Sequence, residues 1–250
     1  MKMIVKTRGV VIQQRSIGEQ DKIITILSED FGVIEASARG VKRMKSGLSG
    51  GIQMLSYSAF ALFKGKSGYI INSAEILEAF YDLRLDVKNV SLASYFCEII
   101  KHLTPGEEGA AEYLRLLLNT LYFLCNHLQT PSFLKMVFEL RVMCIAGFTP
   151  ALDACAVCGK TFADSDVTFL PNDGVLCCQD CLREIDSTVR ISLNATTLTA
   201  LRYLTESDLA HVLKAQMDES LVTFLGSISE YYVLAHCERG FKTLDLYRSL

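Results

Sequence analysis

Two pairs of cysteines have the spacing of metal ligands. Cys155 and Cys158 form one Cys-x2-Cys pair, and after a gap of nineteen residues Cys178 and Cys181 form a second. Two tight turns that each present a pair of thiolates can complete a tetrahedron, which is the ligand set of structural zinc sites. Because four thiolates fill the coordination sphere, no position is left for water or a substrate. The pattern therefore predicts one structural zinc ion.

Cys177 makes the register of the second pair ambiguous by one residue. A pairing of Cys177 with Cys181 would leave three residues between the ligands, whereas Cys178 keeps the spacing of the first pair. We therefore favour Cys178 and keep Cys177 as the alternative ligand. The remaining cysteines lie at apolar positions of helical patterns, where core packing explains them: Cys97, Cys125, Cys144 and Cys237.

A basic segment, residues 38–51, is the second candidate site. Its sequence is ARGVKRMKSGLSGG, and its cations fall within seven residues: Arg39, Lys42, Arg43 and Lys45. Cations supply salt-dependent affinity for phosphates, and glycines let backbone N–H groups approach them closely. Further cations are expected to extend the positive surface: Arg8, Arg15 and Lys22. This pattern predicts contact with the backbone of DNA without readout of its sequence.

Aromatic side chains are missing from the basic segment itself. None lies between Phe31 and Tyr57, so bases would have to stack on residues of the neighbouring strands, with Tyr57, Phe60 and Tyr69 as the candidates.

The charge of the chain is unevenly distributed. The formal net charge is −3, but residues 1–80 carry +4 and residues 151–190 carry −4. The basic N-terminal part and the acidic cysteine-rich part are therefore expected to be separate modules with separate partners.

No catalytic motif accompanies these residues. The Gly-Lys-Ser run at residues 65–67 lacks the earlier glycine of a phosphate-binding loop, because Phe60 stands in its place. The sequence has no HExxH or GxSxG motif, and its histidines are scattered: His102, His127, His211 and His236. The sequence indicates a protein that is not an enzyme and has no small-molecule substrate.

The first 80 residues show the alternation of short strands. Runs of β-branched and aromatic residues occupy 2–14, 22–28, 32–38, 55–63 and 69–77. Two of the connections are short enough for hairpins, and the basic segment is the long link between the third and fourth strands. This arrangement predicts an OB-type barrel, with an SH3-like barrel as the alternative.

From about residue 81 the apolar period becomes helical. Helices are predicted near 87–103, 107–124, 131–146, 194–204 and 218–237. We therefore expect an α+β multidomain protein: an OB-fold DNA-binding domain at 1–80, a helical domain in two parts at 81–150 and 189–250, and a four-cysteine zinc-binding insert at 151–188. No apolar run reaches the length of a signal peptide or a membrane span, so the expected location is the cytoplasm, in association with the nucleoid.

Taken together, these segments resemble the bacterial RecO family of recombination mediators over essentially the whole chain. The resemblance is carried by the N-terminal pattern VKTRGVVIQQRSIGEQDKIITILSEDFG, the loop RGVKRMKSGLSGGIQ, and the insert with CAVCG and DGVLCCQDC. It assigns the four cations of the loop to DNA contact and the two Cys-x2-Cys pairs to zinc.

The resemblance also implies a function and partners. It implies a non-enzymatic mediator that binds single- and double-stranded DNA and anneals complementary strands. With RecR it would help RecA to load onto DNA coated by single-strand-binding protein, whose C-terminal tail would be a further partner. The rival interpretation is a zinc-stabilised scaffold for protein interactions without direct DNA binding.

Overall fold

The computed structural model describes residues 3–41, 48–65, 68–104, 110–162, 166–183 and 185–250. The chain forms two compact units, one of Met1–Leu128 with Phe241–Leu250 and one of Gln129–Gly240. The predicted division into a barrel, two helical parts and an insert stays a prediction.

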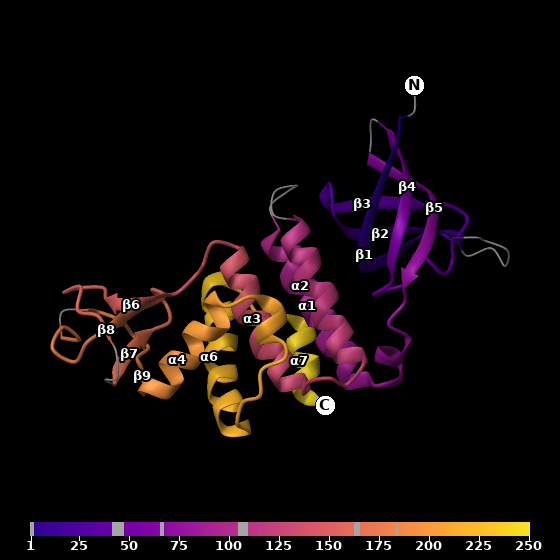
Figure 1. Cartoon of the computed structure of the whole chain (residues 1–250). Helices are drawn as coiled ribbons and strands as arrows, with labels where there is room; N and C mark the ends of the chain where they lie inside the picture. Colours follow the sequence, from indigo (N-terminus) through magenta and orange to yellow (C-terminus); the bar gives the residue numbers. More distant parts are fainter. Residues whose placement is uncertain (1–2, 42–47, 66–67, 105–109, 163–165, 184) are drawn as a thin grey trace. The chain divides into compact units, whose positions relative to one another are not determined.

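The first unit begins with a closed barrel of five strands, which Figure 1 shows in indigo to magenta: β1 (Met3–Ile17), β2 (Asp21–Ser28), β3 (Gly32–Ala38), β4 (Tyr57–Gly65) and β5 (Gly68–Glu78). The order around the barrel is β1-β2-β3-β5-β4, and β4 pairs with β1 to close it. All pairs are antiparallel except β3 with β5. The predicted OB-type barrel is therefore present.

The barrel interior is filled by side chains from alternate strand positions, as the pleat requires. Its core includes branched aliphatic residues and one aromatic residue: Val11, Ile24, Ile26, Ile34, Phe60, Leu62 and Ile71. Val41 and Ile52, which lie in the connection between β3 and β4, belong to the same core. Both ends of that connection are thus packed into the barrel.

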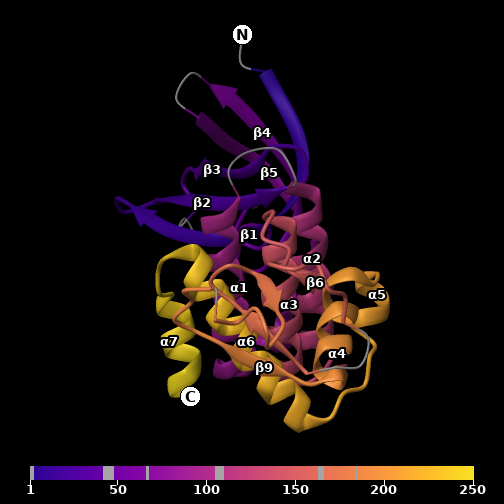
Figure 2. The same cartoon turned by 90° about the vertical axis from the view of Figure 1, so that its left-hand side faces the viewer.

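The remainder of the first unit is helical: η1 (Tyr81–Leu85), α1 (Val87–Leu103), α2 (Ala110–Cys125) and α7 (Lys242–Ser249). The carboxylate of Asp86 caps α1 by accepting from the backbone N–H groups of Lys88 and Asn89. α7 lies beside α1 (Figure 2), where Thr243 donates its backbone N–H and its hydroxyl to the carboxylate of Glu98. The sequence patterns did not predict α7 as a separate helix.

The second unit combines helices with a small sheet: α3 (Pro131–Ile145), β6 (Ala151–Cys155), β7 (Val167–Leu170), β8 (Val175–Cys177), β9 (Ile191–Leu193), α4 (Ala195–Glu206), α5 (Leu209–Val212) and α6 (Glu219–Cys237). The strands are ordered β6-β8-β7-β9. Each helix predicted from the sequence is present within a few residues of its expected bounds. Among the helices of the described ranges, none combines the length and the apolarity needed to cross a membrane.

The packed pair of helices α3 and α6 buries charged groups. Lys135 Nζ lies 2.8 Å from Glu139 Oε1 and 2.7 Å from Glu230 Oε2. Glu139 is fully buried and also accepts the hydroxyl of Ser229 at 2.7 Å. Burial acts to lower the pKa of Lys135, but the attraction of Glu139 and Glu230 outweighs it and raises that pKa. The buried carboxylate of Glu139 is therefore compensated by a charged lysine.

Candidate metal centre and nucleic-acid interface

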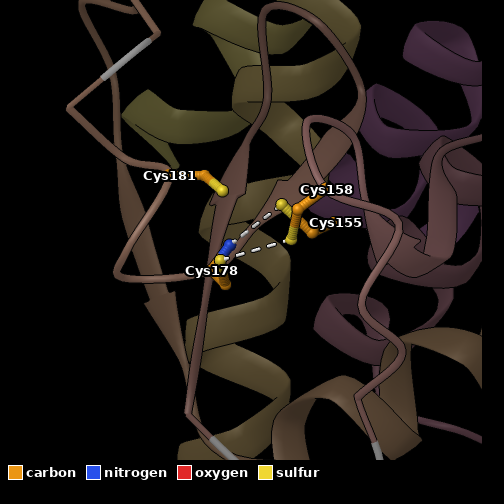
Figure 3. A group of neighbouring side chains, drawn as sticks. All are labelled: Cys155, Cys158, Cys178 and Cys181. Atoms are coloured by element: carbon orange, nitrogen blue, oxygen red, sulfur yellow. Dashed lines mark hydrogen bonds between the residues drawn. The ribbon is translucent and has the colours of Figure 1, made fainter.

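The four predicted cysteine ligands converge on one point in the second unit (Figure 3). Cys155 ends β6 and Cys158 lies in the following turn, while Cys178 and Cys181 follow β8. Their sulfur atoms all lie within 4.8 Å of one another, and the sulfurs of Cys158 and Cys178 are 3.8 Å apart. Zn–S bonds of about 2.3 Å in a tetrahedron would separate the sulfurs by about 3.8 Å. The four thiols therefore fit a tetrahedral metal ion.

A tight turn presents the first pair. The backbone N–H of Gly159 donates to the carbonyl of Cys155 at 2.9 Å, and the N–H of Cys155 donates to the carbonyl of Lys160 at 2.8 Å. Gly159 has a φ of 72°, in the left-handed region that a residue without a Cβ adopts readily.

Cys177 is not a member of the cluster. Its thiol is fully buried and donates to the carbonyl of Cys178 at 3.4 Å. Burial, reinforced by the nearby Cys155 thiolate, raises the pKa of Cys177 to about 11. Burial also acts to raise the pKa of Cys155, but hydrogen bonds from the backbone N–H groups around it, chiefly those of Cys158 and Cys178, outweigh it and lower the pKa to about 6. The backbone N–H groups around Cys155 thus favour its thiolate form, which is the form that binds metal.

The predicted DNA-contacting residues lie on the barrel where the structure describes them. Arg39 is exposed at the start of the connection between β3 and β4, whereas Lys42, Arg43 and Lys45 lie outside the described residues. Lys22 is opposite Ala38 in the pairing of β2 with β3, and Arg15 is opposite Ile23 in the pairing of β1 with β2. Three predicted cations, Arg15, Lys22 and Arg39, thus lie at one end of the barrel.

Arg8 lies toward the other end of β2, since its neighbour Gly9 is opposite Ser28. It lines an open cleft of about 490 Å³ together with Lys6 and three carboxylates: Glu29, Asp30 and Glu75. Acidic groups share this cleft with Arg8, and at the opposite end of the barrel Arg39 likewise lines an open pocket together with Glu19 and Asp21.

Two of the predicted cations have partners within the barrel. Arg15 pairs with Glu35 at 3.0 Å, and since both side chains are about half exposed, this ion pair contributes little to stability. Lys22 Nζ donates to Gln14 Oε1 at 2.9 Å, and Gln14 Nε2 donates to the carbonyl of Ile52, also at 2.9 Å. Lys22 therefore also helps to hold the far end of the basic connection.

Hydrogen bonds hold both ends of this connection. The backbone N–H of Gly40 donates to the carboxylate of Asp21 at 2.7 Å, and the hydroxyl of Ser58 donates to the carbonyl of Gly51 at 2.8 Å. A Cβ at position 51 would lie 2.5 Å from the carbonyl oxygen of Ala74, so only glycine fits there. The basic segment therefore begins and ends at defined points on the barrel. Asp21 and Gln14 were not predicted from the sequence, because strand alternation does not reveal which distant backbone group a side chain bonds.

One prediction about base stacking is wrong. Phe60 is only 2% exposed and belongs to the barrel core, so no base can reach its ring. Tyr57 and Tyr69 are half-buried on the barrel, and the ring centroid of Tyr69 lies 5.7 Å from Lys64 Nζ. They stay the candidates for stacking.

Comparisons with known proteins agree with this architecture. Two family models match the chain, Recombination protein O N terminal over residues 1–80 and Recombination protein O C terminal over residues 84–245. The DNA repair protein RecO of Acetivibrio thermocellus is 36% identical over 245 residues, covering 98% of this chain and 96% of that protein. The DNA repair protein RecO of Alkaliphilus metalliredigens is 34% identical over 249 residues, covering 99% and 100%. The chain therefore belongs to the RecO family of recombination and DNA repair proteins.

Proposed function

We propose that this protein binds the backbone of single- and double-stranded DNA through its barrel and, as a mediator, anneals complementary strands. With RecR it assists the loading of RecA onto DNA coated by single-strand-binding protein, and the C-terminal tail of that protein is a further partner. The observation that supports the proposal is that Arg39 is exposed where the basic connection begins, at the barrel end where Arg15 of β1 and Lys22 of β2 also lie. OB-type barrels commonly bind single strands without sequence preference, using positively charged side chains that contact the backbone.

The metal is proposed to be one structural zinc ion held by Cys155, Cys158, Cys178 and Cys181. Four thiolates suit zinc and leave no open coordination position, so the ion supplies folding energy rather than chemistry. The support is the convergence of the four sulfurs, which all lie within 4.8 Å of one another. We further propose residues 1–80 as the DNA-binding domain and residues 151–188 as the zinc insert between two helical parts.

Removal of the loop cations should weaken DNA binding. A variant with Arg39, Lys42, Arg43 and Lys45 all changed to alanine is expected to lose affinity for a labelled single strand, as measured by fluorescence anisotropy. If each cation neutralises one phosphate, the slope of log affinity against log salt becomes shallower by about 3. The difference in affinity from the unchanged protein is then expected to shrink as salt is added.

A matched control removes two lysines and two arginines from exposed positions of the second unit: Lys160, Arg183, Lys214 and Arg239. It makes the same change in net charge, and its affinity and salt slope should stay near those of the unchanged protein. Equal losses in both variants would show a general charge effect and contradict the proposed interface. A protein without DNA binding at low salt, even with RecR present, would favour the scaffold interpretation.

Two variants of Asp21 separate the effect of its hydrogen bond to Gly40 from the effect of its negative charge. Asp21→Asn keeps an acceptor for the Gly40 N–H while removing a negative charge near the basic segment, so DNA affinity should stay equal or rise. Asp21→Ala removes the acceptor as well, so the segment loses one of its attachments and affinity should fall several-fold below that of Asp21→Asn. Anisotropy titrations of both variants at one salt concentration make the comparison. Equal affinities for the two variants would mean that the hydrogen bond to Gly40 does not position the segment.

A further inference from the structure

We infer that Arg202, on α4, is a positioning residue for the metal centre. The inference rests on the proposed metal site and assigns a role to a side chain that lies outside both cysteine pairs. Arg202 donates from Nε and Nη2 to the carbonyl of Leu152 at 2.9 and 2.6 Å. It also donates from Nη1 and Nη2 to the carbonyl of Phe162, both at 3.3 Å.

These two carbonyls lie on either side of the first cysteine pair. Leu152 precedes Cys155 by three residues and Phe162 follows Cys158 by four, so one guanidinium joins the chain entering the turn to the chain leaving it. The side chains of Leu152 and Phe162 are buried, at 2% and 4% exposure, so packing holds both backbone positions. The turn is thus closed at its base by a rigid, planar group with several donors.

The turn that precedes β8 and the second cysteine pair is bonded to a different helix. On α6, the hydroxyl of Tyr231 donates to Asn172 Oδ1 at 2.8 Å, and His236 Nε2 lies 3.1 Å from the carbonyl oxygen of Pro171. These contacts hold the turn between β7 and β8, and Cys178 directly follows β8. The chain segments that lead to the two cysteine pairs are thus bonded to different helices, the first to α4 and the second to α6.

The physical consequence is preorganisation. A site whose ligands are already placed loses less conformational freedom on binding, so its affinity is higher than that of a loose site. Groups that orient ligands from outside the coordination sphere typically contribute a factor of 10 to 100 in metal affinity. Arg202 acts on the backbone of the turn rather than on a ligand sulfur, so the lower figure is expected.

The test is the zinc affinity of the full-length protein, measured by competition with a chromophoric chelator. Arg202→Met should lower the zinc affinity about tenfold. Arg202→Lys keeps the positive charge but has fewer hydrogen-bond donors than arginine, so it should lower the affinity less. Amide exchange of the zinc-free proteins gives a second readout. The N–H of Cys155, which is bonded to the carbonyl of Lys160, should exchange faster in Arg202→Met than in the unchanged protein.

Arg141 supplies the matched control. It too donates to two backbone carbonyls in the second unit, those of Thr205 and Ser207 at the end of α4. Arg141→Met therefore disturbs the end of α4 but leaves the bonds from the Arg202 guanidinium to the turn in place, so its loss of zinc affinity should be clearly smaller than that of Arg202→Met. Unchanged affinity in Arg202→Met, or an equal loss in Arg141→Met, would overturn the inference. If Arg202→Met does not fold, a zinc affinity of Arg202→Lys equal to that of the unsubstituted protein would overturn the inference. Absence of zinc binding in the unsubstituted protein would instead overturn the proposed metal site.

Discussion

Changing Cys155 and Cys158 together to serine is expected to reduce the zinc content from about one ion per chain to none. The serine hydroxyl is not a zinc ligand in such sites, and two thiolates alone do not hold the ion at a structural site. In isolated zinc modules the metal contributes roughly 10 to 16 kcal/mol of apparent binding free energy, which is also folding free energy. The sheet β6–β9 has short strands of three to five residues, so its fold should depend strongly on the ion.

Metal analysis and amide exchange measure this result. In the serine variant, residues 151–188 should lose most of their protection from exchange, while the barrel strands keep theirs. The exposed position of Cys158 gives a chelator access to the site, so excess chelator should produce the same exchange pattern in the unchanged protein.

Cys177→Ala serves as the control for ligand register. Cys177 lies next to the cluster but bonds to a backbone carbonyl, so this variant should keep its zinc, whereas Cys178→Ala should lose it. The reverse pattern would move the ligand register by one residue. Full metal in the double serine variant would show that the ion binds elsewhere.

The change Lys135→Met is expected to destabilise the protein by about 3 to 5 kcal/mol, because it leaves a buried carboxylate without its cation. Glu139 is completely buried, whereas Glu230 is partly exposed and can be solvated. The large effect therefore comes from Glu139. Urea unfolding at neutral pH, followed by a signal from the second unit, gives the difference in the free energy of unfolding.

Two further variants separate the charge from the packing. Lys135→Met combined with Glu139→Leu removes both buried charges and should recover most of the lost stability. Lys214→Met changes an exposed lysine of the same unit and should stay within about 0.5 kcal/mol of the unchanged protein. A double variant as unstable as Lys135→Met alone would show that lost packing, rather than the unpaired Glu139, causes the effect.

RecO proteins are recombination mediators rather than enzymes, and the sequence without catalytic motifs agrees with this.

Much of the fold was predictable because the signals are local. The strands β2 and β3 follow from runs of β-branched residues, and α3 follows from Thr130, whose hydroxyl accepts the N–H of Phe133, and from the proline after it. The clustering of the four cysteines was predictable because their spacing reflects the geometry of the turns.

Other features depend on contacts between distant residues, and no local pattern reveals them. The strands β6, β8 and β9 are only three to five residues long, too short to show a clear alternation. Arg202 bonds to carbonyls 40 and 50 residues earlier in the chain. Phe60 was wrongly expected at the surface because alternation places every second residue on one face without showing which face is the interior.

The discontinuity of the first unit has a consequence for synthesis of the protein. Glu98 of α1 bonds to Thr243 of α7, 145 residues later, so this part of α1 stays uncovered after the ribosome has completed residues 1–128. At about 5 to 20 residues per second, α7 follows roughly 6 to 24 s later. The barrel can form early because its contacts are local by comparison, whereas the helical part of the first unit waits until the whole second unit has been made. The nascent chain therefore presents the apolar surface around Tyr95, later covered by Phe241, to chaperones for seconds.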